Sequence, residues 1–251
     1  MRILGGTGIS GALAICLFTC SSPANEPAPP VIVVGDFANP PFSSWNDAHE
    51  PVGIEVEILD MVGKELDRPI EWRELPFSEM LPAAEQGTAH VAASTIGITE
   101  ERARRVRFTE SYHQTELSVV VRSGAGEPAS LSELSGLRVG AGHATTSEDA
   151  VRRTLPEATL VVERKEDVTF GEMLLAGGLS AVVMDRPAAK RLVDEYPERM
   201  EILKDHLGVE RYAFAVNPNE VEIVDAINTV ILRLRDEGWF ESRTAEHASL
   251  D

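Results

Sequence analysis

Cysteine is almost absent from this chain of 251 residues: the only two, Cys16 and Cys20, lie close to its N-terminus. The remainder of the sequence therefore offers no thiol for a disulfide framework, a Cys-ligated metal or a cysteine nucleophile. Basic residues are also scarce, with 23 Lys and Arg against 41 Asp and Glu, for a formal net charge of -18. Such an acidic chain repels phosphate backbones and anionic headgroups, which argues against nucleic-acid binding and electrostatic membrane docking.

Groupings typical of metal sites and hydrolases are missing too. The 6 histidines are scattered and none forms a pair at metal-ligand spacing, so we expect no metal. No Gly-x-Ser-x-Gly turn occurs, and nothing marks a Ser-His-Asp set. We therefore expect no catalytic residue of these kinds and place the chemistry of the protein in a ligand site.

What the sequence does contain is a composition typical of a globular protein, with 43% hydrophobic and 25% charged residues. The first nineteen residues predict an export signal, because Arg2 precedes an apolar run over 11–18 that is too short to span a bilayer. Leu17-Phe18-Thr19-Cys20 resembles the bacterial lipobox, which would make Cys20 the lipidated residue. Thr19 departs from the usual small residue, so cleavage by the ordinary signal peptidase stays open. Residues 20–30 are a Pro-rich tether, and the folded body begins near Val31.

The body alternates short apolar runs with amphipathic segments, which predicts an α/β fold with mostly parallel sheets. Expected strands lie at 31–34, 70–72, 91–95, 117–121, 137–141, 159–162, 181–184 and 211–216. Expected helices lie at 53–66, 78–86, 147–155, 168–176, 186–195 and 221–235, with a short one opening at Thr99. The Gly- and Pro-rich stretch 123–128 is the best boundary between two similar blocks. Two such blocks predict two lobes with a ligand cleft between them.

The sharpest local pattern is Ser94-Thr95-Ile96-Gly97-Ile98-Thr99-Glu100-Glu101-Arg102. A buried strand ends near Thr95, the loop at Gly97 exposes N–H groups, and Thr99 can cap a helix whose first turn holds Arg102. A helix N-terminus with a guanidinium fork is matched to a carboxylate. The alternative is that Arg102 pairs with a neighbouring glutamate on a solvated face.

A second strand–glycine–helix pattern is Gly140-x-Gly142-x-x-Thr145, with Glu163 at the end of the next strand. It nearly matches the dinucleotide fingerprint. Thr145 stands where the third glycine is expected, however, and an exported protein would meet little nicotinamide cofactor, so we expect no cofactor. Thr145 and Glu148 instead fit a helix capping box.

Asp185 follows the apolar strand 181–184 and precedes Arg186-Pro187. A carboxylate at this edge of a parallel sheet points into the crevice where α/β proteins bind ligands. Asp before Arg-Pro also suits a helix N-cap, and both readings can hold for one residue.

Taken in order along the chain, several short motifs resemble the polar-amino-acid family of bacterial extracellular solute-binding proteins (family 3). They are Pro40-Pro41-Phe42, Gly53-Ile54-Glu55-Val56-Glu57-Ile58, Leu75-Pro76-Phe77, Ile98-Thr99-Glu100-Glu101-Arg102 and Ala181-Val182-Val183-Met184-Asp185. The resemblance covers essentially everything after the tether. It implies a two-lobed periplasmic-binding fold (type II), with the chain crossing twice, so that 31–122 and 212–251 form one lobe and 123–211 the other.

The resemblance also implies roles for particular residues. Arg102 would bind the ligand carboxylate, and Asp185 the α-ammonium group. The remaining residues carried over are Thr95, Gly97 and Thr146 beside Arg102, and Asp36, Phe77, Asn39, Thr145 and His143 elsewhere in the cleft. Three departures leave the ligand side chain open: Asn39 replaces a common aromatic, Gly97 a frequent serine, and His143-Ala144 a Gln-Gly pair.

By this resemblance we expect a periplasmic monomer that delivers an amino acid or similar zwitterion to the permease of an ABC importer, and the lipobox-like motif predicts a lipid anchor on Cys20. Two alternatives stay open. One is a dehydratase of cyclohexadienyl acids on the same fold, and the other is a ligand-sensing partner of a different membrane protein.

Overall fold

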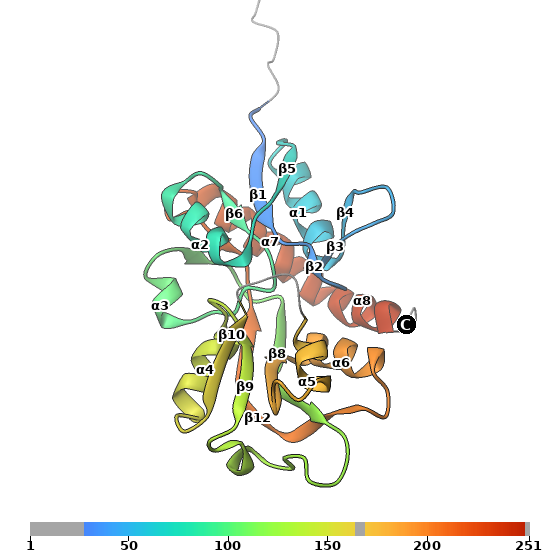
Figure 1. Ribbon diagram of the computed structural model, residues 1–251. Helices are drawn as coiled ribbons and strands as arrows, with labels where there is room; N and C mark the ends of the chain where they lie inside the picture. Colours follow the sequence, from blue (N-terminus) through green and yellow to red (C-terminus); the bar gives the residue numbers. More distant parts are fainter. Residues whose placement is uncertain (1–27, 164–168, 249–251) are drawn as a thin grey trace, which may run out of the picture.

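The computed structural model describes residues 28–163 and 169–248. The expected export signal, Cys20 and most of the tether lie outside these residues. Two sheets, each flanked by helices, form an upper and a lower part of the molecule (Figure 1). A small third sheet joins β2 (Ala38–Asn39), β3 (Ser43–Trp45) and β4 (Pro51–Val52).

The first sheet has the order β5-β1-β6-β13-β7. Strand β1 (Val31–Gly35) lies between β5 (Ile70–Glu74) and β6 (Val91–Ala92) and is parallel to both. The sheet is completed by β13 (Ala215–Val216), which returns from the far end of the chain and runs antiparallel between β6 and β7 (Arg107–Phe108). The β-branched run in β1 is almost fully buried, as expected for a strand covered on both faces.

Helices cover both faces of this sheet. On one face α1 (Ile54–Glu65) packs against α7 (Val221–Asp236) in a common core with the strands. On the other face lies α2 (Phe77–Gln86). The apolar residues of α1 and α7 recur every three or four positions, which is the spacing that buries one side of a helix. The last helix, α8 (Trp239–Ala248), packs against α7.

The second sheet has the order β10-β9-β11-β8-β12. Its parallel part comprises β9 (Arg138–Gly142), β10 (Thr159–Glu163) and β11 (Ala181–Asp185), and β8 (His113–Arg122) runs antiparallel to β11. One face is covered by α4 (Thr146–Thr154), and the other by α5 (Phe170–Leu175) and α6 (Arg186–Glu195). A short 3-10 helix, η1 (Leu131–Leu134), precedes β9.

The largest difference from the sequence prediction concerns β8 and β12 (Met200–Tyr212). The segment 117–121 was expected in the first lobe, but β8 pairs in the second sheet, with β12 as its outer neighbour. The sheets therefore divide the chain just before His113 and again after Tyr212. Both strands extend between the junction and the lower part, β8 running away from the junction and β12 returning to it (Figure 1).

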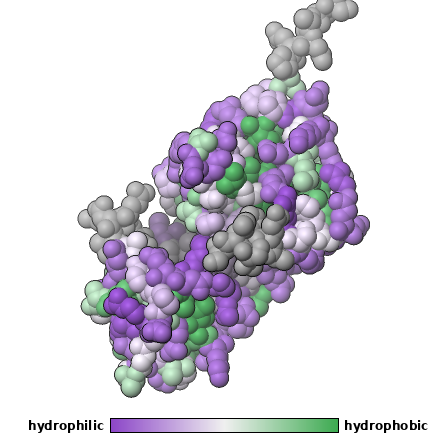
Figure 2. Space-filling view, turned by 90° about the vertical axis from the view of Figure 1, so that its right-hand side faces the viewer, coloured by the Kyte–Doolittle hydropathy of each residue, from purple (hydrophilic) through white to green (hydrophobic). Residues whose placement is uncertain are grey.

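No helix among the described residues is long and apolar enough to span a bilayer. One face of the molecule is mostly hydrophilic, and its hydrophobic residues gather in separate patches on the upper and lower parts (Figure 2).

Candidate functional site

Polar side chains from both parts of the molecule converge where the two sheets approach each other. The first part contributes the loop after β6 and the helix α3 (Glu100–Ala103), and the second part contributes the N-terminal ends of α4 and α6. The C-terminal end of β12 lies between them and carries Glu210 and Tyr212. Each of these segments lies at or just after the C-terminal end of a strand. Ligands of α/β proteins usually bind at this edge of the sheet.

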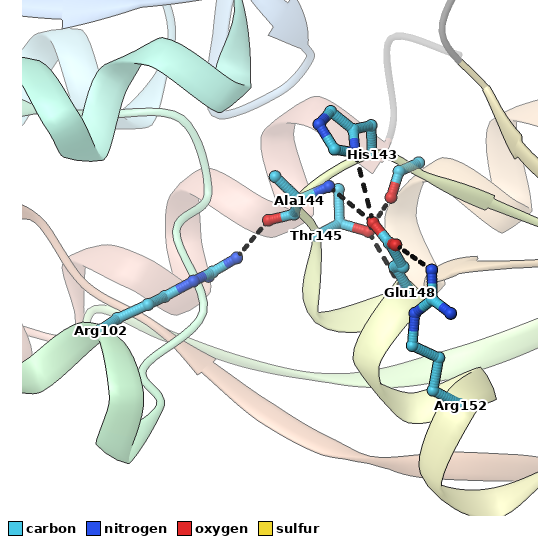
Figure 3. Close-up of polar contacts among 7 residues, drawn as sticks. Arg102, His143, Ala144, Thr145, Glu148 and Arg152 are labelled. Carbon is cyan, nitrogen blue, oxygen red and sulfur yellow. Dashed lines mark hydrogen bonds and ion pairs between the residues drawn. The ribbon is translucent and has the colours of Figure 1, made fainter.

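Arg102 is the buried cation of this region, with only 7% of its surface exposed. Its Nη1 donates to the carbonyl oxygen of Gly97 at 2.8 Å and its Nη2 to that of Ala144 at 2.9 Å. The second bond joins the two parts of the molecule (Figure 3). The guanidinium also lies over the ring of Phe77, 5.6 Å from its centroid.

The position of Arg102 is set locally by Thr99, whose hydroxyl accepts the Arg102 N–H at 3.1 Å as the expected helix cap. Burial lowers the pKa of Arg102, and Glu210 is the strongest charge opposing that effect. Within the described residues no carboxylate lies within ion-pair distance of the guanidinium. The alternative in which Arg102 pairs with a neighbouring glutamate on a solvated face is therefore wrong.

Glu210 is a site residue that the sequence did not predict. Its Oε2 accepts the hydroxyl hydrogen of Thr146 at 2.6 Å. A Cβ atom placed on Gly97 would lie only 2.3 Å from the same oxygen. Burial raises the pKa of Glu210 to about 7; the Thr146 bond opposes this rise, Asp185 adds to it, and Arg102 opposes it.

Asp185 precedes α6 and forms the helix cap that its position suggests, together with a contact to Tyr212 that the sequence did not predict. Its Oδ1 accepts the N–H of Ala188 at 3.3 Å, so it caps the helix. Its Oδ2 accepts a short hydrogen bond from the hydroxyl of Tyr212. Burial raises the pKa of Tyr212, and the Asp185 charge adds to this effect, which keeps the phenol a donor.

A second acidic group lies at the end of β1. The Oδ1 of Asp36 accepts the hydroxyl of Ser94 at 2.6 Å and the side-chain amide of Asn39 at 2.9 Å. Burial raises the pKa of Asp36, and these hydrogen bonds oppose the rise. Asp36 and Asn39 therefore belong to one network with the loop that precedes Thr95.

Thr95 adopts a left-handed backbone conformation with φ of 47°, which is uncommon for a β-branched residue. Its N–H donates to Oε1 of Glu55 at 2.9 Å, and the same oxygen accepts a short bond from the hydroxyl of Tyr112. Glu55 is fully buried, and burial raises its pKa to about 7. The motif around Glu55 was recognised in the sequence, but its contact with Thr95 was not.

Thr145 and His143 have more local contacts. The Thr145 hydroxyl donates to the carbonyl oxygen of Gly142 at 2.7 Å and accepts the N–H of Glu148 at 3.3 Å, so it caps α4. Only half of the capping box forms, because Glu148 accepts the N–H of Ala144 instead. His143 lies 3.5 Å from Glu148, and Ala144 separates this pair from Arg102 (Figure 3).

An open cavity of about 860 Å³ lies beside this cluster. It is lined from the first part by Pro40, Pro41 and Phe42, from the second by α6, and by the residues 113–116 of β8. Arg102, Asp185 and Glu210 do not line it: Arg102 is buried beside the cavity, and Asp185 and Glu210 are half-buried.

Two α/β parts with polar groups enclosed at their junction define a two-lobed solute-binding fold. The profile of the bacterial extracellular solute-binding proteins, family 3, matches residues 31–247, and the chain belongs to that family. The predicted family and fold class are thereby confirmed.

Three similar proteins illustrate the relationship. An L-arginine-binding protein of Pseudomonas aeruginosa is 27% identical, over 96% of this chain and 95% of its own. The solved structure of an ancestral arginine-binding protein bound to arginine is 26% identical, with a TM-score of 0.76 over 88% of this chain and 99% of that one. An ancestral amino-acid-binding protein described as a precursor of cyclohexadienyl dehydratase is 22% identical, with a TM-score of 0.76 over 86% of this chain and 94% of that one. This last likeness concerns the fold alone.

Proposed function

We propose that this protein captures an amino acid or similar zwitterion between its lobes and presents it to the permease of an ABC importer. The observation that carries the proposal is Arg102. Its guanidinium is buried between the two lobes and donates hydrogen bonds to carbonyl oxygens, but among the described residues it forms no ion pair with a carboxylate. Such a group is suited to bind an anion. A ligand carboxylate would supply charge-assisted hydrogen bonds worth about 1.5–3 kcal/mol each.

The carboxylate end of the ligand would therefore lie against Arg102, with the loop at Thr95 and Gly97 on one side and Thr146 on the other. Thr146 begins α4, whose unsatisfied N–H groups favour an anion. Thr145 serves this subsite indirectly, because its hydroxyl shapes the turn that presents Thr146.

Asp185 would receive the α-ammonium group opposite Arg102. For the ligand side chain, Asp36 and Asn39 offer a polar surface and Phe77 an apolar wall, with His143 at the rim. The half-buried acids Asp36 and Asp185 suit a cationic ligand, and the arginine-binding relatives support the same class.

Closure follows from contacts shared by the two lobes. A ligand that contacts Arg102 in one lobe and Asp185 in the other stabilises the closed state more than the open one. The segments before β8 and after β12 would act as the hinge, since the chain passes between the sheets there. The permease could then distinguish loaded from empty protein.

The remaining parts of the proposal concern location and assembly. The relatives are named as binding proteins, which supports a receptor rather than an enzyme. We propose that the mature protein is a periplasmic monomer held at the membrane by lipid on Cys20. Metabolic labelling with a palmitate analogue tests the anchor, because Cys20→Ala should lose the label.

Calorimetric titration of the purified protein with the twenty L-amino acids, starting with L-arginine, tests the ligand class. We expect at least one to bind with a dissociation constant of micromolar order, which requires about 8 kcal/mol. Failure of all twenty below millimolar concentration would show that the ligand class is wrong.

A further inference from the structure

The half-buried carboxylate of Glu210 lies where the proposed function places the ligand carboxylate. Its Oε2 holds the Thr146 hydroxyl at 2.6 Å and crowds Gly97, where even a Cβ atom would be 2.3 Å away. These are two of the groups that, under the proposed function, receive the ligand carboxylate beside Arg102. Glu210 thus accepts the Thr146 hydrogen bond that the ligand carboxylate would otherwise accept.

Gly97 and Glu210 also fit each other sterically. The backbone of Gly97 is not in the left-handed region, so a larger residue would meet no conformational strain there. Its side chain would instead collide with Glu210 and with the Thr146 methyl group, 2.9 Å from the ideal Cβ. The glycine at this position therefore makes room for the glutamate.

We propose that Glu210 is a specificity-determining residue, which competes with the ligand carboxylate for Thr146 and the Gly97 loop and makes capture of that carboxylate depend on proton uptake. The proposal rests on the proposed function, because it concerns the same subsite. Two carboxylates cannot both remain ionised in one enclosed space without a large repulsion. A carboxylate ligand therefore binds best when Glu210 is neutral.

The charged and titratable groups around Glu210 set the direction of this effect. Arg102 on α3 attracts its anion, whereas Asp185 at the start of α6 repels it. The phenols of Tyr112 and Tyr212 lie within electrostatic reach and stay neutral, since burial raises their pKa. Burial dominates and raises the pKa of Glu210 to about 7, and an adjacent ligand carboxylate raises it further.

The sign of the linkage follows directly. The complex holds a proton on Glu210 more tightly than the free protein does, so affinity is constant below pH 7 and falls as the pH rises above 7. With a free-state pKa of about 7, the affinity for a carboxylate ligand drops about tenfold between pH 6 and pH 8. A ligand that lacks a carboxylate escapes this loss.

Calorimetry at pH 6 and pH 8 with L-arginine and with agmatine, its decarboxylated counterpart, tests the proposal. If L-arginine does not bind, the amino acid that binds best in the panel and its decarboxylated amine take the place of this pair. Between pH 6 and pH 8 we expect the wild type to lose about tenfold in affinity for L-arginine and to show no such loss for agmatine. For Glu210→Gln, the dissociation constant of L-arginine should change less than threefold between the same two pH values. The matched control is Glu201→Gln, which alters an exposed glutamate on the same strand and should behave as wild type.

A second measurement needs no variant. Titrations of wild type at pH 8 in buffers of different ionisation enthalpy should show uptake of close to one proton with L-arginine and none with agmatine. The proposal is overturned if Glu210→Gln keeps the wild-type pH dependence of L-arginine affinity, or if no proton is taken up on binding. It is also overturned if the variant binds L-arginine tenfold more weakly than the wild type at pH 6, which would mean that Glu210 binds the ligand cation. If no amino acid binds either protein at pH 6, the proposed function itself is wrong and this inference falls with it.

Discussion

Replacing the buried carboxyl Glu55 with glutamine should change how the stability of the protein depends on pH. Glu55 is fully buried, and its pKa is raised to about 7 from an ordinary value of 4.5. The folded state therefore binds a proton that the unfolded state releases above pH 4.5. The stabilisation from that proton is fully present below pH 4.5 and is lost as the pH rises through 7.

The size of the effect follows from the shift. Each pKa unit corresponds to about 1.4 kcal/mol, so the full loss is about 3 kcal/mol, of which about 2 to 3 kcal/mol falls between pH 5 and pH 8. Urea unfolding at both pH values measures it: the wild type should lose this much more stability than Glu55→Gln on going to pH 8. The exposed glutamate Glu79 provides a control, since Glu79→Gln should retain the wild-type difference.

The variant can be less stable at both pH values, because the glutamine amide would replace an oxygen that has no partner in the buried site. The comparison therefore concerns the difference between pH 5 and pH 8 and not the absolute stability. Equal losses in wild type and Glu55→Gln would refute the reasoning that burial of this carboxyl makes the fold pH-dependent.

Three further substitutions have expected outcomes. Arg102→Lys keeps the charge but cannot bridge two acceptors in the same fork, so calorimetry should show at least a tenfold loss of amino-acid affinity; unchanged affinity would contradict the carboxylate assignment. Gly97→Ala should displace Glu210, and crystallography should find its carboxylate moved away from position 97; an undisturbed Glu210 would contradict the close packing. Gly53→Ala should lower the free energy of unfolding in urea by about 2 kcal/mol or more beyond the loss in Gly124→Ala. The two glycines have nearly the same φ, 125° and 126°, but the new Cβ atom would lie 2.4 Å from the Phe42 carbonyl oxygen at Gly53 and in open space at Gly124. Equal losses would contradict the steric argument.

Much of the fold could be predicted because most segments follow a simple hydrophobic period. The helix α6 begins and ends at the expected residues, α1 is shorter by one residue at each end, and α7 is longer by one residue at its C-terminal end. The long strand β12 was missed over most of its length, since exposed charged residues interrupt its apolar ones and its pairing with β8 is irregular. Alternation alone could not show which sheet β8 joins, because that depends on β11 and β12, which lie far away in the sequence.

The candidate site was predicted in part. The sequence placed Arg102 and Asp185 on loop–helix junctions, and the structure brings these junctions together between the lobes. Glu210 was missed because it lies in the strand whose extent was not recognised, and nothing local marks one glutamate among many. Its only sequence signal was indirect: Gly97 stands where the resembling family frequently has serine, and a side chain there would collide with Glu210.

Native mass spectrometry of the purified protein, exposed to an equimolar mixture of the twenty L-amino acids, tests the central claim most directly. We expect a complex with one amino acid per chain in the wild type and none in Arg102→Ala, with thermal unfolding showing that the variant is folded. An absence of any complex, or one that Arg102→Ala retains in full, would contradict the account of a zwitterion held between the two lobes by this guanidinium.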